Sequence, residues 1–128
     1  MIEHFTEFTG RPNRTYTDLP RVTLNWKGIF LLNRHAYEAL ERPAAVKLLF
    51  DGNNQVIAMQ AADIRHSNSF ALKQKDKYFN RMICAAPFCR HFGVNVSGTV
   101  LFNDIEINSK GLMKLDLKNA ITVGRGAC

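Results

Sequence analysis

The sequence predicts an α+β fold in which two similar ββαββ units form one compact, mostly-β, pseudo-dimeric domain with two short helices. Segments that alternate apolar and polar residues between turn-forming residues predict the strands, and two short segments with helical apolar spacing predict the helices. The order strand, strand, helix, strand, strand occurs twice. With 128 residues, 46% of them hydrophobic and 22% charged, the chain is long and apolar enough to bury one core.

The chain divides into five segments. Residues 1–20 contain glycine, proline and asparagine without a sustained period, which predicts an N-terminal arm. The first ββαββ unit covers residues 21–60, a polar connector covers 61–68, and the second unit covers 69–118. Residues 119–128 contain a Gly-Arg-Gly sequence and are expected to form a flexible tail.

The first unit begins with two short strands and a helix. Val22–Trp26 alternates apolar and polar residues, and Ile29–Leu32 is a compact apolar run that follows a Lys-Gly turn. Asn33 stands where a helix N-cap belongs, and the helix is expected over Arg34–Glu41. An Asp-Gly turn within the mostly apolar residues 46–59 then predicts a hairpin.

The second unit repeats this order. Phe70–Leu72 and Arg81–Cys84 are predicted strands, with a turn at Lys75–Lys77 between them. A second helix is predicted over Ala86–Phe92, because proline is tolerated in its first turn and Gly93 stands where a C-terminal cap belongs.

A last hairpin, formed by Val100–Ile107 and Leu112–Leu117, completes the second unit. The central parts of the two units align without a gap. The aligned pairs are Gly28 with Asn80, Asn33 with Ala85, Ala36 with Phe88, and Leu40 with Phe92. Since glycine and asparagine tolerate positive φ best, the first pair also predicts a shared turn geometry. This alignment predicts an internal duplication.

Residues Lys27–Asn33, followed by Ala36, Leu40 and a hairpin with an Asp-Gly turn, resemble the AbrB/MazE-type swapped-hairpin domain. In that family a turn glycine leads into an apolar strand, a short helix and a second hairpin, and two copies interlock. The second unit has the same pattern, and its Phe92–Val94 is similar to the family's leucine, glycine, isoleucine helix ending. Glu41 stands where the family has a glycine after the first helix.

The resemblance implies that one chain contains both halves of what is usually a homodimeric barrel, as in MraZ-like proteins with tandem copies. Each half alone would bury too little apolar surface to be stable, whereas two interlocked halves would share one core. Family members bind double-stranded DNA through basic residues on one face. The positions of this chain that match are Lys27, Arg34 and Arg81.

The formal net charge of +6 indicates a polyanionic partner. Between Arg65 and Arg81, five basic residues meet one acid, with aromatic residues interleaved, and such a segment can bind phosphates and stack on bases. The same pattern is also typical of a solvated strand edge guarded by lysines. The predicted nucleic-acid-binding residues are Lys27, Arg34, Arg65, Lys73, Lys75, Lys77 and Arg81.

No catalytic or metal site is predicted. Cys84, Cys89 and His91 lack the spacing of zinc ligands, and the two cysteines are expected to serve as small apolar core residues. The other histidines supply no grouped ligands. Trp26 is expected in the core or at its rim.

The sequence therefore predicts a small, non-enzymatic, transcription-regulator-like protein that binds double-stranded DNA without a cofactor. Two alternatives stay open: a protein-interaction module of a phage, plasmid or host-defence system, and a single-stranded nucleic-acid binder that uses Tyr78 and Phe79. A homodimer is also compatible with the sequence. No apolar run of membrane length or secretory signal is visible, and three cysteines form no closed disulfide framework, which favours a cytoplasmic location.

Overall fold

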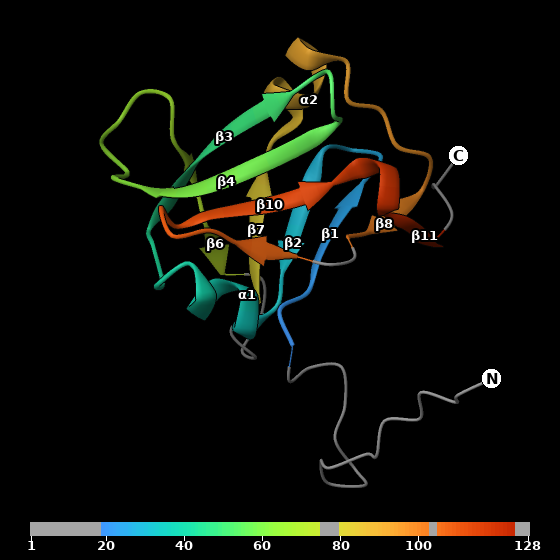
Figure 1. Ribbon diagram of the computed structural model, residues 1–128. Coiled ribbons are helices and arrows are strands. Elements are labelled where there is room, and N and C mark those ends of the chain that lie inside the picture. The colour runs from blue at the N-terminus through green and yellow to red at the C-terminus, as the bar shows by residue number, and fades with distance from the viewer. Residues whose placement is uncertain (1–18, 75–79, 103–104, 125–128) are drawn as a thin grey trace, which may run out of the picture.

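The fold consists of two antiparallel sheets and two short α-helices (Figure 1). The computed structural model describes residues 19–74, 80–102 and 105–124. The predicted α+β, mostly-β class with two short helices is confirmed.

The larger sheet has six strands in the order β11-β8-β1-β2-β7-β6. These strands are β1 (Val22–Asn25), β2 (Ile29–Leu32), β6 (Lys73–Gln74), β7 (Arg81–Cys84), β8 (Thr99–Leu101) and β11 (Ile121–Gly124). The smaller sheet has five strands in the order β5-β3-β4-β10-β9. These strands are β3 (Ala45–Asp51), β4 (Val56–Ala62), β5 (Phe70–Ala71), β9 (Glu106–Ile107) and β10 (Leu112–Asp116).

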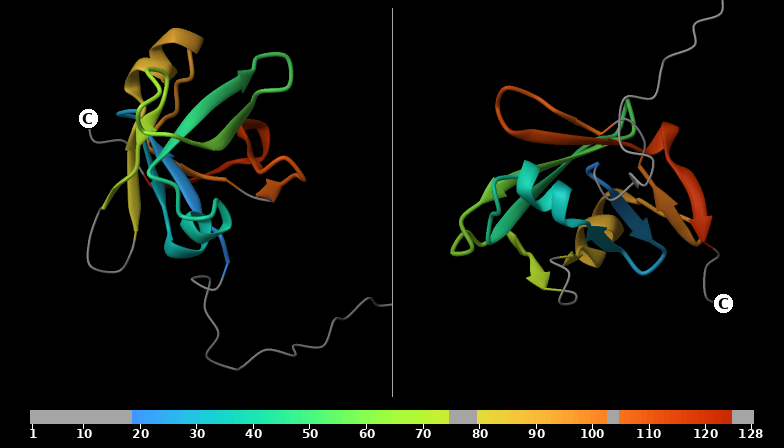
Figure 2. Two further views of the ribbon diagram at one scale, coloured as in Figure 1. Left: turned by 90° about the vertical axis from the view of Figure 1, so that its left-hand side faces the viewer. Right: turned by 90° about the horizontal axis from the view of Figure 1, so that it is seen from below.

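The two helices lie at opposite ends of the molecule (Figures 1 and 2). Helix α1 (Arg34–Ala39) begins after Asn33, whose side chain caps it, and helix α2 (Ala86–Phe92) ends at Gly93 in the left-handed conformation. Both caps agree with the sequence prediction. Among the described residues, no helix has the length and apolar character needed to cross a membrane.

Around the two helices the backbone repeats at an interval of 52 residues, which is the interval of the predicted alignment. Equivalent backbone hydrogen bonds open and close the two helices. They join Tyr37 to Asn33 (3.1 Å) and Arg42 to Tyr37 (3.0 Å) in the first unit, and Cys89 to Ala85 (3.0 Å) and Val94 to Cys89 (2.8 Å) in the second. Glu41 and Gly93, again 52 residues apart, both have φ of 67°. A position that Gly93 occupies without strain is therefore held by a glutamate in the first unit.

The two units exchange strands to complete both sheets. Strand β1 pairs with β2 of its own unit and with β8 of the other, while β3 pairs with β4 of its own unit and with β5 of the other. The equivalent strands β2 and β7 pair antiparallel, and so do the second-hairpin strands β4 and β10. Antiparallel pairing between counterparts is the arrangement that a twofold axis between the units requires, so the halves interlock.

One core lies between the sheets and receives side chains from both units and both helices. Its members are Val22, Leu24, Phe30, Leu32, Ala36, Leu40, Val46, Ile57, Met59, Ile83, Ala85, Phe88, Cys89, Val94, Val100, Phe102, Met113 and Leu115. The rings of Phe30 and Phe102, from different units, stack with centroids 6.3 Å apart. Because the core is shared, neither unit can lose the other without exposing apolar surface.

Two predicted strands are each divided between the two sheets. The predicted strand Val100–Ile107 contains β8 and β9, and the predicted strand beginning at Phe70–Leu72 contains β5 and β6. At each division a bulky side chain turns inward: Phe102 is 3% exposed, and Leu72 packs against the core. The residues on either side of it then pair with different sheets, which local alternation alone does not reveal.

Residues 121–124 correct the prediction of a flexible tail. After a short 3-10 helix, η2 (Leu117–Asn119), the chain forms β11 against β8. Ile121–Val123 is a run of β-branched residues, which favour strands, and β8 offers an open edge for pairing. The turn predicted at Lys75–Lys77 lies outside the described residues.

Candidate nucleic-acid interface

Asn33 fixes the start of α1 to the preceding chain. Its Oδ1 accepts hydrogen bonds from the backbone N–H groups of Ala36 (2.9 Å) and Arg21 (2.9 Å), and its Nδ2 donates to the carbonyl of Leu19 (2.7 Å). The backbone N–H of Asn33 also donates to the carbonyl of Arg21 (3.0 Å). One side chain therefore sets the direction in which the residues of α1 face the solvent.

Three arginines gather around one tyrosine at the α1 end of the molecule. We define Arg34, Tyr37, Arg42 and Arg81 as the α1 cluster. Arg81 comes from β7, and its guanidinium carbon lies 4.2 Å from the centroid of the Tyr37 ring, a cation–π arrangement. Arg34 and Arg42 line a surface pocket of about 190 Å³ together with Tyr37 and Glu38. The cluster thus joins the first unit to the second.

The α1 cluster has a small positive net charge. Arg34 is paired with Glu38 at 3.4 Å (Nε to Oε2), but the side chains are 56% and 38% exposed, so the pair is weak. Within the described part of the chain, no carboxylate is paired with Arg42 or Arg81. Three guanidinium groups against the carboxylates of Glu38 and Glu41 leave a charge of +1. Guanidinium groups held in this way can bind phosphate through two hydrogen bonds each.

The lysines predicted beside Arg81 are only partly placed. Lys73 on β6 pairs with Met82, the residue after Arg81, so it lies at the same edge of the larger sheet. Since successive strand residues point to opposite faces, its side chain extends from the outer face, whereas Arg81 points toward α1. Lys75 and Lys77 lie outside the described residues.

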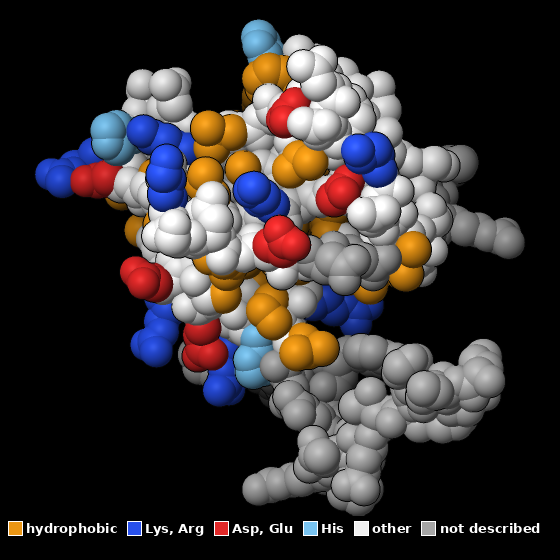
Figure 3. All heavy atoms as spheres, viewed as in Figure 1, with side chains coloured by type: hydrophobic (Ala, Val, Ile, Leu, Met, Phe, Trp, Pro, Cys, Tyr) orange, Lys and Arg blue, Asp and Glu red, His pale blue; other side chains and the backbone are white. Residues whose placement is uncertain are grey.

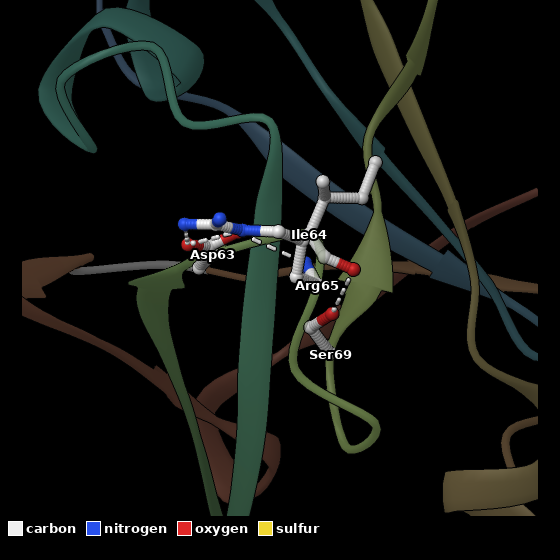
Figure 4. Close-up of polar contacts among 4 residues, drawn as sticks. All are labelled: Asp63, Ile64, Arg65 and Ser69. Carbon is white, nitrogen blue, oxygen red and sulfur yellow. Dashed lines mark hydrogen bonds and ion pairs between the residues drawn. The ribbon is translucent and has the colours of Figure 1, made fainter.

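Arg65 is paired within its own connector (Figure 4). Its Nη2 lies 2.7 Å from Oδ2 of Asp63, and its Nε donates to both carboxylate oxygens at 3.1 Å. The guanidinium lowers the pKa of the Asp63 carboxyl, and the carboxylate raises the pKa of Arg65. The Arg65 side chain is 87% exposed, and its charge is balanced by its neighbour.

Lys27 lies at the other end of the molecule. It occupies the β1–β2 turn, and β2 separates this turn from Arg34 by roughly 13 Å of strand. Its Nζ lies 5.3 Å from the ring centroid of Trp26. Trp26 was predicted in the core or at its rim; it is 46% exposed and lies outside the core. The seven predicted binding residues therefore do not form one surface: Arg34 and Arg81 come together, while Lys27 and Arg65 lie elsewhere.

The two described cysteines lie in different environments. Cys89 is buried, and burial raises the pKa of its thiol. Cys84 is exposed on β7, which corrects the prediction that it belongs to the core. In the part of the chain that the structure describes, no group of three or more His, Cys, Asp or Glu side chains is placed to hold a metal ion.

Sequence reasoning missed Tyr37 and Arg42. The spacing of Arg34, Tyr37 and Glu38 gave a local signal, because residues three and four apart share a helix face. Arg42 follows the helix and returns beside it because two successive residues, Glu41 and Arg42 itself, are left-handed, with φ of 67° and 52°. The contact with Arg81 depends on the pairing of β2 with β7, for which the sequence carries no local signal.

The resemblance to the swapped-hairpin domain stays a prediction. No protein-family model, curated protein or solved structure matches the chain.

Proposed function

We propose that this protein binds double-stranded DNA through the α1 cluster and acts as a small, non-enzymatic, transcription-regulator-like protein in the cytoplasm. The observation that carries the proposal is the convergence of Arg34, Arg42 and Arg81 around Tyr37, from both units of the chain. A net charge of +6 favours approach to a polyanion. In the α1 cluster, three guanidinium groups are close enough together to bind neighbouring phosphates of one DNA backbone.

The arginines would bind the phosphate backbone rather than read the bases. A guanidinium has a planar set of donors that matches two phosphate oxygens. The Tyr37 ring holds the Arg81 guanidinium in place, so Arg81 loses less side-chain freedom on binding than an unsupported arginine. Phosphate contacts carry no direct sequence information. We therefore expect binding that depends strongly on salt and weakly on sequence.

Duplex binding fits the cluster better than binding of single strands. Binding of single-stranded nucleic acid usually requires aromatic rings that stack on bases. One face of the Tyr37 ring is occupied by Arg81, and Trp26 lies at the other end of the molecule beside Lys27. Tyr78 and Phe79 lie outside the described residues.

The test is a salt titration of binding to a duplex of mixed sequence, starting from about 50 mM salt, where phosphate contacts are strong. The triple variant R34Q/R42Q/R81Q should bind at least about tenfold more weakly, a loss of about 1.4 kcal/mol. If three phosphate contacts disappear, the slope of log affinity against log salt should flatten by about 2.7.

A matched control removes the same charge elsewhere. Lys47 and Lys114 lie on the smaller sheet and Lys118 on η2, and the variant K47Q/K114Q/K118Q also loses three positive charges. We expect it to keep the salt slope of the natural protein. Equal weakening by the two triple variants would overturn the proposed site, and tighter binding to an unstructured single strand than to the duplex would overturn the proposed ligand.

A further inference from the structure

The outer face of the six-stranded sheet carries mostly apolar residues and almost no charge. Cross-strand pairing places one continuous row of residues over all six strands. From β6 to β11 this row is Lys73, Met82, Leu31, Thr23, Leu101 and Ile121. A second, shorter row contains Cys84, Ile29, Asn25 and Thr99. We call these two rows together the uncharged face, because Lys73 at its edge is its one charged member.

The uncharged face points away from the core. Leu24, Phe30 and Ile83, which alternate with its members along three central strands, are at most 1% exposed. The members of the uncharged face on these strands are partly exposed, except Cys84, which is exposed. At the edge of the face, Ile121 is 49% exposed. Both helices contribute residues to the core, as Ala36 and Phe88 show, so they lie on the inner side of the sheet. No helix or strand among the described residues covers this face.

The outer face of the five-stranded sheet differs in charge. Its central row, from β3 to β9, is Leu49, Ala58, Lys114 and Glu106, and Lys47, Asp51 and Asp116 lie on the neighbouring rows. Figure 3 shows basic, acidic and apolar side chains interspersed on the side where this sheet lies. Charges of both signs keep such a face in water. An uncharged outer face is therefore a property of one sheet and not of the fold.

We propose that the uncharged face binds the same face of a second copy of this chain in a weak, reversible homodimer. A contiguous apolar patch of a few hundred Å² on a soluble protein is often a functional surface. A twofold-symmetric dimer joins a surface to itself, so the surface must be self-complementary. This face meets that condition, since it brings no like charges together at its centre and removes no ion pair from water. A partner of either charge would gain nothing from electrostatic attraction there.

The size of the face sets the strength of the dimer. The six strands are spaced by about 4.8 Å and have two to four residues each, so the face spans at most roughly 24 Å by 13 Å, or about 300 Å² in projection. A standard stable interface buries about 800 Å² on each partner. The face is well below that size, so the association is weak.

Salt distinguishes this association from DNA binding. Each copy carries a net charge of +6, so two copies repel one another at low salt. Added salt screens that repulsion and leaves the apolar contact intact, so dimerisation strengthens as salt rises. Phosphate contacts weaken under the same change. The proposed dimer does not depend on the proposed function, and either one can fail alone.

The test is sedimentation of the full chain under reducing conditions, from about 5 µM to about 500 µM, the range in which an association in the micromolar class becomes populated. The average mass should rise toward that of two chains at the upper end. L31K at the centre of the face and I121K at its edge should both stay monomeric; I121K keeps the test valid if L31K fails to fold. L49K adds the same charge to the other sheet, where Leu49 is 45% exposed, and should dimerise like the natural chain.

Cys84 provides a second measurement within the face. The rate at which the Cys84 thiol is alkylated can be followed by mass spectrometry of the peptide that contains it. This rate should fall as the protein concentration rises and as salt is added. Buried Cys89 serves as the internal reference, because its protection does not depend on concentration. A chain that stays monomeric at about 500 µM and high salt overturns the proposal, and so does loss of the dimer in L49K alone.

Discussion

The regions around α1 and α2 share the backbone hydrogen bonds that open and close each helix, but their side chains differ. At the α1 end, Asn33 caps the helix and Glu41 closes it, whereas at the α2 end Ala85 provides no side-chain cap and Gly93 closes the helix. Both closing residues have φ of 67°. The repeated hydrogen bonds show that the backbone pattern tolerates either solution.

The difference lies in what surrounds each helix. Around α1, arginines converge on Tyr37 and leave a charged, water-facing end. Around α2, the rings of Phe50, Phe88 and Phe92 pack together, with centroids 5.1 to 6.4 Å apart. A repeated pattern of helix hydrogen bonds therefore supports a cluster of arginines at one end and an aromatic cluster at the other.

The largest expected effect comes from a close contact between the two units at Gly28. Gly28 has φ of 81°, and a Cβ added there would lie 2.8 Å from the Cα of Ala86 at the start of α2. G28A should lower the free energy of unfolding by about 3 kcal/mol, from backbone strain and from the clash with the other unit. Urea denaturation measures the change.

A control for G28A separates the backbone strain of a positive φ from the steric clash with Ala86. Gly111 has φ of 79°, and nothing lies within 4 Å of a Cβ added there. G111A should therefore cost only about 1 kcal/mol. If the two variants lose equal stability, the close contact between Gly28 and Ala86 is not a constraint on the fold.

A smaller effect is expected at the cap that only the first unit has. N33A removes the acceptor for two backbone N–H groups and the donor to Leu19, so it should destabilise the protein by about 1–2 kcal/mol. N33D keeps the acceptor and loses only the donor, so it should retain more than half of that stability in the same measurement. Equal losses in both variants would show that the cap contributes little.

The smallest effects concern the two left-handed closing residues. G93A should cost about 1 kcal/mol by strain alone, because nothing lies within 4 Å of the added Cβ. E41G should stabilise the protein by about 0.5 kcal/mol, because it relieves the same strain in the first unit. Thermal denaturation of both variants gives the comparison. A stability loss in E41G would mean that the glutamate side chain makes a compensating contact.

Local signals in the sequence predicted most elements of the fold. Asn33 and Gly93 mark helix ends because their side chain or backbone satisfies groups that a helix leaves open. The Asp-Gly turn between β3 and β4 gave that hairpin correctly. The divisions at Leu72 and Phe102 were not predicted, since they depend on which sheet each neighbouring residue joins, and such pairing is long-range.

The candidate site was predictable only in part, for the same reason. Arg34 and Arg81 are 47 residues apart in the chain and meet at Tyr37 because β2 pairs with β7. A count of basic residues along the chain favoured the whole stretch from Arg65 to Arg81, of which only Arg81 belongs to the α1 cluster. There Arg65 is paired with Asp63, a neighbour whose effect a segment count does not include.

The exchange of strands between the units also decides how the chain can acquire its structure. Strand β1 pairs with β8, and β8 pairs with β11. The larger sheet can therefore be completed only when nearly the whole sequence is available. During synthesis, a first unit that has left the ribosome alone has open edges on both hairpins and only half of the core. Pairing strands from different units closes long loops of chain, which slows folding. Because each unit completes the other's sheets, we expect the two units to fold in one cooperative transition.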